Sequence, residues 1–545
     1  MTQLNILIVI PARGGSKGIP RKNLRALNGR PLLAYSAGTA RESRFKADIY
    51  VSSDDQEILT LARKLGVKVH QRDPDKARDV TTLDPVVFDV YQYAQEQEKK
   101  QYDIVVTFQP TSPLIKPSTL DSAIERMLQR PEIDTIITAT NDTHLTWKME
   151  EGRYLPNYSQ RVNRQFLPQT FKETGGLMLT RTRCISEGGR IGPRVDLFLL
   201  AGAESIDIDS YEDWSLCEYY LRRKKILFVV SGYKEIGLGH VYNTLLLAND
   251  ILNHEVVFLV DARSEMAYRK IAERNYPVQI QRGADIVDDI RCLSPDMVVN
   301  DVLDTTDEYM LALKNLGCKI LNFEDLGPGA NHADLVVNAM YPEQDILPRH
   351  YFGHKYFCLR DEFLYTPRME VQQKVENVLL TFGGVDPCNF TQKVLSSIYE
   401  FCRAQKISIT VVAGFGYDKY DTLQDFDNIS IASNASNISD HMNMADIVFT
   451  SAGRTTFEVA AIGIPAIVLC QNQREATHFF ATKENGFLNL GLGSLLPQGD
   501  ILQAFRRLCE SFDRRAHMAA LMRQLDLTQG RTNVLKLLIQ TLEQQ

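Results

Sequence analysis

The chain has 545 residues, too many for one hydrophobic core, and this length predicts about two to four domains. Its composition, 44% hydrophobic and 24% charged, is that of an ordinary globular protein, and its net charge of −7 argues against non-specific nucleic-acid binding. We expect neither a membrane span, which needs ~20 apolar residues, nor a signal peptide. The nine cysteines are scattered without a C-x-x-C pair, so we expect reduced thiols, no zinc site and a cytoplasmic protein.

The first predicted element is a buried strand over residues 4–10, and a glycine-rich, cationic loop follows it. Glycines allow backbone N–H groups to surround an anion, while cations neutralise its charge. A triphosphate is the guest that this loop favours. Its spacing matches neither the P-loop nor the dinucleotide fingerprint. The loop contains Gly14, Gly15 and Gly18 together with Arg13, Lys17, Arg21 and Lys22.

Strands and helices alternate after the loop. We expect helices over 31–39 and 56–65, with strands over 47–53, 67–71, 103–108 and 135–140. This alternation predicts an α/β fold with a parallel, doubly wound sheet whose ligands lie beyond the carboxyl ends of the strands. Arg72 and Thr82, in the polar segment after the strand over 67–71, are candidate partners for a phosphate or carboxylate and for a base or ribose.

Two acids near the end of this half suggest a metal site. We expect a strand over 205–209, in which Asp207 and Asp209 would point to the same face. Two carboxylates beside a triphosphate form a hard-oxygen site that suits Mg²⁺.

The string IPARGGSKGIPRKNL, residues 10–24, resembles the nucleotide-binding signature of the CMP-sialic acid synthetases, cytidylyltransferases that activate nonulosonic acids. QPTSPL at 109–114 and RQFLP at 164–168 are similar to further motifs of that family. The resemblance implies a Rossmann-like nucleotidyltransferase domain, homodimers or higher homo-oligomers, and metal-binding aspartates placed like Asp207 and Asp209. Ile115 and Thr174 depart from the family, which has arginine and asparagine there.

The same resemblance, together with the loop chemistry, gives the candidate residues of the first half. The expected CTP-binding residues are Ala12, Arg13, Gly14, Gly15, Ser16, Lys17, Lys22, Asn23, Arg72 and Thr82, of which Arg13, Lys17 and Lys22 are the catalytic candidates. The expected sugar-acid-binding residues are Gln109, Thr111, Ser112, Lys148, Arg164 and Gln165. The anomeric hydroxyl of the sugar acid would attack the α-phosphorus of CTP and release pyrophosphate, with positioning and charge neutralisation dominating catalysis.

A basic tetrad at 222–225 followed by a new apolar strand at 226–230 predicts a domain boundary. We therefore expect domains over 1–224 and 225–545, the second with lobes over about 225–368 and 369–545. The loop that follows the new strand ends in Gly237-Leu238-Gly239-His240. A histidine near a helix N-terminus tends to stay neutral and can act as a base, although a helix-capping role is the alternative.

In each of the segments 378–386 and 446–458, a strand ends in glycines or small hydroxyl residues and a helix begins. The start of such a helix offers N–H groups to a diphosphate. With IGLGH at 236–240, TFGGVDP at 381–387 and SAGRTTFE at 451–458, this half resembles the UDP-sugar hydrolases of pseudaminic acid biosynthesis and, more distantly, the MurG-like glycosyltransferases of GT-B type. The resemblance implies that His240 is the catalytic base. Asn243 stands where that family has arginine. The implied UDP-sugar-binding residues are Gly237, Gly239, His240, Gly383, Gly384, Ser451, Ala452, Gly453, Thr455, Glu458, Asn472 and Gln473.

Together these features predict a bifunctional enzyme of nonulosonic acid biosynthesis. The first half would transfer CMP from CTP to a nonulosonic acid, and the second would hydrolyse a UDP-linked amino sugar. Two alternatives stay open for the second half: a glycosyltransferase, and a non-catalytic UDP-sugar sensor that regulates the first half.

Overall fold

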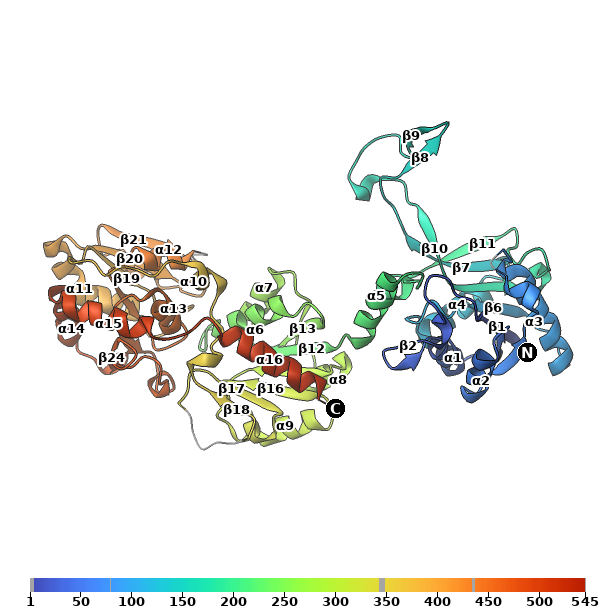
Figure 1. Ribbon diagram of the computed structural model, residues 1–545. Helices are drawn as coiled ribbons and strands as arrows, with labels where there is room; N and C mark the ends of the chain where they lie inside the picture. Colours follow the sequence, from blue (N-terminus) through green and yellow to red (C-terminus); the bar gives the residue numbers. More distant parts are fainter. Residues whose placement is uncertain (1–3, 79, 343–347, 434–436, 545) are drawn as a thin grey trace. The chain divides into compact units, whose positions relative to one another are not determined.

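The computed structural model describes residues 4–78, 80–342, 348–433 and 437–544 (Figure 1). The chain divides into two compact units, Met1–Arg223 and Lys224–Gln545. The predicted fold class is confirmed, because the first unit is built on one large mixed sheet covered by helices and the second contains two Rossmann-like lobes. Within the described residues, no helix is both long enough and apolar enough to cross a bilayer.

The first unit is built on a seven-stranded sheet of order β11-β7-β10-β6-β1-β4-β5. Its strands are β1 (Ile6–Pro11), β4 (Ala47–Ser53), β5 (Lys68–Gln71), β6 (Ile104–Phe108), β7 (Thr135–Asn141), β10 (Phe171–Arg181) and β11 (Val195–Leu199). Its helices are α1 (Leu33–Glu42), α2 (Gln56–Lys64), α3 (Leu83–Glu98), α4 (Pro117–Gln129) and α5 (Tyr211–Arg222). A small ribbon of β2 (Ala26–Leu27) and β3 (Arg30–Pro31) follows the glycine-rich loop.

The central strand β1 is apolar on both faces because helices cover both. Ile6, Ile8 and Ile10 pack with residues of α1, α2 and α4, while Leu7 and Val9 pack with residues of α3. Successive side chains of a strand point to opposite faces, so a continuous apolar run is what a doubly covered strand requires. The loop after β1 therefore starts from a rigid, fully buried strand.

The sheet is not wholly parallel, which corrects the sequence-based expectation. Strand β10 is antiparallel to both β6 and β7. After β7 ends at the carboxyl edge, residues 142–170 leave the sheet and form the hairpin of β8 (Trp147–Glu150) and β9 (Arg153–Pro156), which projects from this unit in Figure 1. The chain returns at Phe171, which pairs with Asn141 at the same edge, so β10 must run in the opposite direction.

The strand expected over 205–209 is also wrong. Gly202–Ser205 forms a 3-10 turn, and residues 206–208 are extended but pair with no strand among those described. A single backbone bond, from Ile208 N to Thr111 O at 2.8 Å, attaches the segment to the loop after β6. The segment lies across the carboxyl edge of the sheet instead of joining it, and alternating polar and apolar residues do not distinguish the two arrangements.

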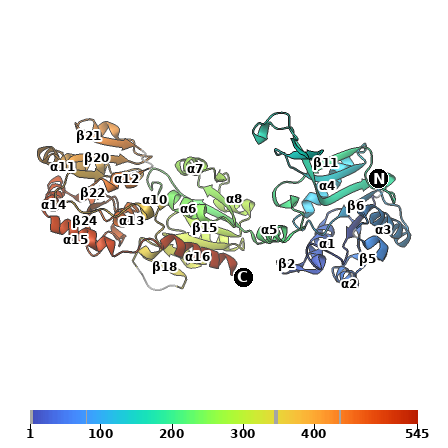
Figure 2. The same ribbon diagram turned by 45° about the horizontal axis from the view of Figure 1, so that its top comes forward.

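The second unit contains two parallel sheets, one in each lobe (Figure 2). The first lobe has the order β14-β13-β12-β15-β16-β17-β18, and the second has β21-β20-β19-β22-β23-β24. The strands of the first are β12 (Lys225–Val230), β13 (Glu255–Val260), β14 (Val278–Ile280), β15 (Met297–Asp301), β16 (Lys319–Phe323), β17 (Leu335–Asn338) and β18 (His350–Phe352). Those of the second are β19 (Asn377–Leu380), β20 (Ser408–Ala413), β21 (Ile429–Ser433), β22 (Ile447–Thr450), β23 (Ala466–Cys470) and β24 (Phe487–Leu492).

Helices connect most of these strands and cover the sheets, as expected for parallel sheets. They are α6 (Gly239–Asp250), α7 (Glu265–Ala272), α8 (Ile286–Leu293), α9 (Asp307–Lys314), α10 (Asp361–Tyr365), α11 (Phe390–Gln405), α12 (Ile438–Asn443), α13 (Thr455–Ile462), α14 (Gln498–Glu510), α15 (Phe512–Arg523) and α16 (Gly530–Glu543).

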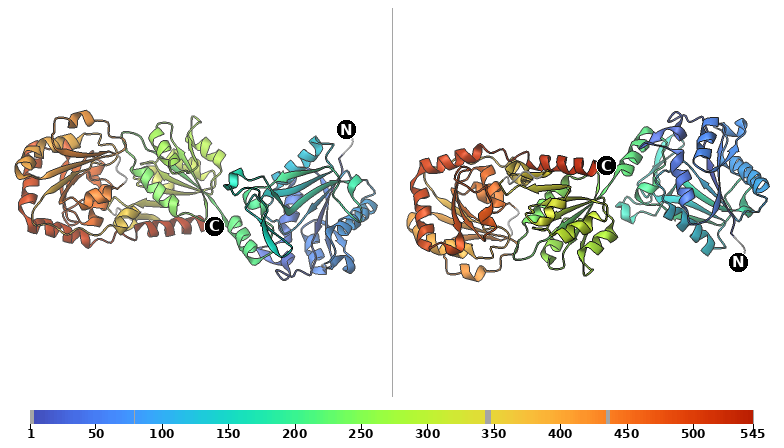
Figure 3. Two further views of the ribbon diagram at one scale, coloured as in Figure 1. Left: turned by 90° about the horizontal axis from the view of Figure 1, so that it is seen from above. Right: turned by 90° about the horizontal axis from the view of Figure 1, so that it is seen from below.

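The last helix, α16, packs on the first lobe although we expected residues 369–545 to form the second. Val534, Leu538 and Leu542 are buried in the same core as Ile226 and Phe228 of β12. Their four-residue spacing gives α16 one apolar face, and that face covers the sheet of the first lobe. Figure 3 shows α16, in red, lying along the first lobe after the chain has completed the second.

Candidate active sites

The glycine-rich loop of the first unit is attached to the carboxyl end of β4. Ala12 N donates to Ser52 O at 2.9 Å, and Gly14 N donates to Asp54 Oδ1 at 3.0 Å. Asn23 closes the loop, since its Nδ2 donates to Arg13 O at 3.0 Å. The residues predicted to form this loop therefore lie close together, and Gly15 and Lys17 are exposed to solvent.

The loop and the acidic segment are brought together although about 190 residues separate them. Lys22 Nζ donates to Ile208 O at 2.5 Å and lies 3.6 Å from Asp209 Oδ1. Gly18 has to be glycine here, because a Cβ at this position would lie 2.6 Å from Asp209 O. Asp209 itself is largely exposed, with 82% of its side chain accessible.

Asp207 is the more buried member of the acidic pair. Within the described chain its Oδ1 is buried and has no hydrogen-bond partner. Burial raises the pKa of the Asp207 carboxyl, and Asp209 raises it further while Thr111 and Lys22 oppose the shift. An orphaned carboxylate oxygen beside a second carboxylate fits a divalent cation, so Asp207 and Asp209 are the residues that would hold Mg²⁺. Among the described residues no cluster of three potential ligands occurs, so water or substrate oxygens would complete the shell.

Gln109 and Asp207 both lie beside Gly175. A Cβ on Gly175 would lie 3.0 Å from Asp207 Oδ2 and 3.3 Å from Gln109 Nε2, and the φ of +71° at this glycine marks the irregularity in β10. Thr111 Oγ1 and Ser112 Oγ are also buried, without partners among the described residues. Four polar side chains predicted to contact sugar acid or metal thus gather at the ends of β6 and β10.

The two departures from the family pattern point inward. Ile115 is 2% exposed, and its Cδ1 would lie 2.5 Å from a Cβ placed on Gly176, so an arginine would not fit there without rearrangement. Thr174 Oγ1 lies 2.9 Å from Thr138 Oγ1. Both side chains therefore lie behind the residues that line the site and support them.

Arg72 is held inside the protein, with 3% exposure. Its Nη2 donates to Ser52 O at 2.9 Å, and burial lowers the pKa of its guanidinium to about 10. This position suits a residue that supports the end of β4 beneath the loop. Thr82 is exposed and precedes the first turn of α3.

The other predicted sugar-acid residues lie in the projecting segment. Lys148 is on β8 and pairs with Glu150 at 2.5 Å. Arg164 and Gln165 line a separate cavity of about 290 Å³, which also has Asn141, Thr143, Leu167 and Gln169 in its wall. The structure does not place these three residues among the polar groups around Asp207.

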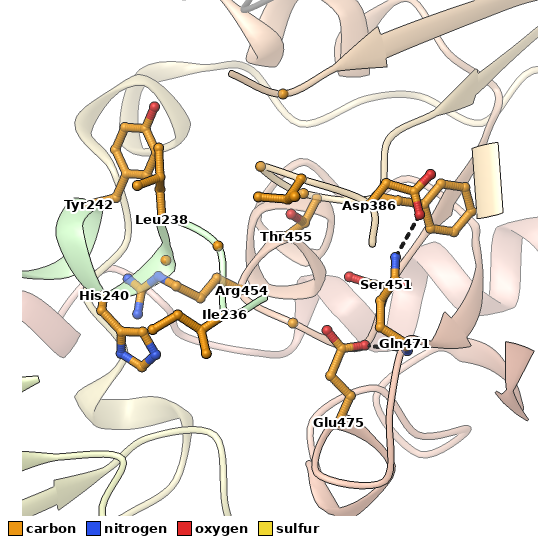
Figure 4. Close-up of a pocket in the computed structure, with 18 of the residues that line it drawn as sticks. Ile236, Leu238, His240, Tyr242, Asp386, Ser451, Arg454, Thr455, Gln471 and Glu475 are labelled. Carbon is orange, nitrogen blue, oxygen red and sulfur yellow. Dashed lines mark hydrogen bonds between the residues drawn. The ribbon is translucent and has the colours of Figure 1, made fainter. Parts of the chain in front are cut away.

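In the second unit, a cavity of about 340 Å³ lies between the lobes (Figure 4). Ten of the twelve predicted UDP-sugar residues line it, and Ala452 and Gln473 do not. Gln471 lines it instead, and its Nε2 donates to Asp386 Oδ1 at 2.9 Å. The lining predicted residues are Gly237, Gly239, His240, Gly383, Gly384, Ser451, Gly453, Thr455, Glu458 and Asn472.

His240 is the second residue of α6 and is joined to a buried aspartate that we did not predict. His240 Nδ1 lies 2.5 Å from Asp301 Oδ1, and Asp301 is 1% exposed at the end of β15. Asn243, one turn along α6, donates from Nδ2 to Asp301 Oδ2 at 2.8 Å. The carboxylate therefore accepts one bond on each oxygen, which favours the tautomer with Nδ1 protonated and leaves Nε2 as the basic nitrogen.

Three more acids in the cavity wall were also missed or placed differently. Glu324 follows β16 and accepts from Ala339 N at 3.0 Å; burial, reinforced by Asp301, raises its pKa to about 8. Burial raises the pKa of Glu475 to about 7. Glu458, one of the predicted UDP-sugar-binding residues, pairs with Arg360 at 2.8 Å. Asp301 and Glu324 each stand at or just after the end of an apolar strand, and that position was the available sequence signal.

The N-terminus of α11, after the TFGG motif, is already occupied. Asp386 accepts from Phe390 N at 2.9 Å and from Thr391 N at 2.8 Å. A diphosphate would compete with this carboxylate there. The N-cap residue of α13 gives the helix no side-chain cap, so its start is the better candidate, although the Glu475 carboxylate lies beside Ser451 and Ala452 just before it.

Comparison with known proteins supports the interpretation of the first unit as a nucleotidyltransferase domain. Residues 7–150 match the sequence profile of the family described as cytidylyltransferase. The chain is 32% identical over 303 residues to an uncharacterized protein of Methanocaldococcus jannaschii, a match that spans 49% of this chain and 62% of that protein. It is 30% identical over 227 residues to the CMP-N,N'-diacetyllegionaminic acid synthase of Legionella pneumophila, spanning 39% of this chain and 95% of that enzyme.

Among solved structures, the chain is similar to MurG of Acinetobacter baumannii, with 17% identity, coverage of 58% of this chain and 99% of that one, and a TM-score of 0.42. The sequence matches, together with the loop and acids assembled at the carboxyl edge of the sheet, establish the family of the first unit. This chain belongs to the cytidylyltransferase family, whose sequence profile its residues 7–150 match.

Proposed function

We propose that the first unit transfers CMP from CTP to a nonulosonic acid. The observation that carries this proposal is the meeting of Lys22 with Asp209, and of Asp207 with Gln109, at the carboxyl edge of the sheet. In the reaction, the anomeric hydroxyl of the acid gives up its proton to water as its oxygen forms a bond to the α-phosphorus of CTP, the bond from that phosphorus to the bridging oxygen of the β-phosphate breaks, and pyrophosphate leaves. Arg13, Lys17 and Lys22 neutralise the phosphates, and Gln109 orients the sugar acid. When bound by Asp207 and Asp209, Mg²⁺ would lower the charge on the phosphate oxygens.

The test is pyrophosphate release from CTP by the full chain, offered a panel of pseudaminic, legionaminic and sialic acids. Formation of a CMP-sugar with one of them supports the proposal and names the substrate. If no acid of the panel is activated while CTP binds, the assignment of the acceptor fails.

We also propose that the first unit forms homodimers through its projecting segment. The hairpin exposes Trp147 (55%), Met149 (62%) and Tyr154 (70%), an apolar surface that is unusual on a monomer. Multi-angle light scattering of the full chain tests this. We expect a dimer for the wild type and a monomer for the double variant Trp147→Ser, Tyr154→Ser. A monomeric wild type would contradict the proposal.

For the second unit, we propose hydrolysis of a UDP-linked amino sugar. The His240–Asp301 pair in the interlobe cavity carries this proposal. A water proton passes to His240 Nε2 as the water oxygen bonds to the anomeric carbon. The bond from that carbon to the diphosphate oxygen breaks, and UDP leaves with the electron pair. The buried Asp301 stabilises the imidazolium that forms.

Incubation of the full chain with UDP-linked diacetamido-trideoxyhexoses, followed by ³¹P NMR, tests this second activity. UDP release that His240→Ala abolishes supports hydrolysis. The cavity also suits the glycosyltransferase alternative, which predicts UDP release only when an acceptor sugar is added. Binding of a UDP-sugar without any turnover would instead favour the sensor alternative.

A further inference from the structure

Four lysine and arginine side chains line the interlobe cavity, and they are not equivalent. Lys234 pairs with Asp418, Arg360 with Glu458 and Glu362, and Arg474 with Asp304. Among the described residues, Arg454 forms no ion pair with any carboxylate.

Arg454 immediately precedes α13 of the second lobe but reaches the first lobe. Its Nη2 donates to Cys358 O at 2.9 Å, and its guanidinium carbon lies 4.3 Å from the centre of the Phe357 ring. These contacts are to neutral groups, so they fix the orientation of the guanidinium and leave its charge uncompensated by a partner carboxylate. Glu324 interacts with this charge at longer range.

The side chain of Arg454 passes directly beside the residues that carry the proposed base. A Cβ placed on Gly239 would lie 3.3 Å from Arg454 Cδ, and His240 is the next residue. Figure 4 shows Arg454 extending from α13 toward the end of α6 that bears His240, with Ser451 and Thr455 on the other side. An uncompensated cation thus lies between the base and the uncapped start of α13.

We propose that Arg454 is the catalytic residue that binds the diphosphate of the nucleotide sugar and stabilises it as it leaves. This inference rests on the proposed hydrolase function of the same cavity. Negative charge grows on the diphosphate as the glycosidic bond breaks, and a fixed cation in a partly buried site stabilises that charge more than the ground state. Asn243, which stands where the hydrolase resemblance implied arginine, is neutral and bound to Asp301, so it does not provide this charge.

Calorimetric binding of UDP, UMP and uridine to the full-length wild type and to Arg454→Met tests the proposal without turnover. We expect Arg454→Met to weaken UDP binding ~10- to 100-fold while uridine binding changes less than about twofold, because only UDP carries the diphosphate. Arg454→Lys should recover part of the loss, and Arg403→Met, on an exposed face of α11, is the matched control that should bind like the wild type.

In turnover, Arg454→Met should lower kcat about 100- to 1,000-fold if the wild type releases UDP. Equal weakening of UDP and uridine, or unchanged UDP affinity, would overturn the role of Arg454. If the wild type releases no UDP from any sugar, the hydrolase proposal and the leaving-group role fail together, while the difference between UDP and uridine still decides whether Arg454 binds the diphosphate.

Discussion

Asp301 Oδ1 lies 2.5 Å from His240 Nδ1, and the other oxygen of the same carboxylate accepts a hydrogen bond from Asn243. Asp301, at the end of β15, thereby fixes two residues of α6 that are one turn apart, His240 and Asn243. The presence of asparagine instead of arginine at position 243 leaves the proposed base in place, because Asn243 positions Asp301 and Asp301 positions His240.

This pairing predicts that Asp301→Asn lowers kcat for UDP release about 100- to 10,000-fold, because the imidazole loses its orientation and the imidazolium loses its partner. Stopped assays at one fixed pH, with UDP affinity as the folding control, measure this loss. A wild-type rate in the variant would mean that Asp301 has no part in catalysis.

In the first unit, Asp207→Asn should reduce CMP-sugar formation about 100-fold or more, since the buried carboxylate is the firmer of the two proposed metal ligands. The variant should also require a higher Mg²⁺ concentration for half-maximal rate. Glu187→Gln, in an exposed loop, is the matched control. An unchanged Mg²⁺ dependence would remove Asp207 from the metal site.

Glu324 makes stability depend on pH. Its pKa in the folded state, about 8, lies above the ordinary value of 4.5, so folding favours the protonated form. This contribution is complete below about pH 4.5 and is lost as pH rises through about 8, at a rate of at most about 1.4 kcal/mol per pH unit. Glu324→Gln cannot ionise and should therefore gain stability relative to the wild type between pH 5 and pH 9. Urea denaturation at both values measures the difference, and a constant difference would contradict the assignment.

The packing of α16 on the first lobe predicts that Leu538→Ala lowers the free energy of unfolding by about 2–5 kcal/mol, because a fully buried leucine is truncated. Lys536→Ala, on the exposed face of the same helix, should change it by less than about 0.5 kcal/mol. Thermal unfolding of both variants tests whether the helix is as firmly docked as its burial indicates. Equal effects would show that it is not.

Much of this architecture follows from local sequence pattern. The alternating apolar segments and glycine turns predict the α/β class, and β4 begins and ends at the residues expected. The direction of β10 does not follow, because it depends on where the 142–170 excursion re-enters the sheet. The sequence identifies Asp207 and Asp209 as an i, i+2 pair. It does not show that their segment lies outside the sheet, because this position depends on a contact with Thr111, almost 100 residues earlier.

The candidate site residues likewise divide into those that local sequence predicts and those that depend on the fold. His240 and the glycines follow motifs and were predictable. Asp301, Glu324 and Arg454 were not, because each acts through a partner brought close only by the fold. Arg454 in particular lies within a recognised motif but is directed by Phe357 and Cys358, which no local pattern connects to it.

The return of α16 to the first lobe also determines the order in which the polypeptide can mature during synthesis. The first unit is continuous in sequence and can fold as soon as it emerges. The sheet of β12–β18 is made next, yet the part of one face that α16 covers, beside α6 and α7, stays exposed until residues 530–543 have been translated, after the entire second lobe. We expect the nascent chain to expose this apolar face throughout that interval, which makes the first lobe of the second unit the natural client of a chaperone.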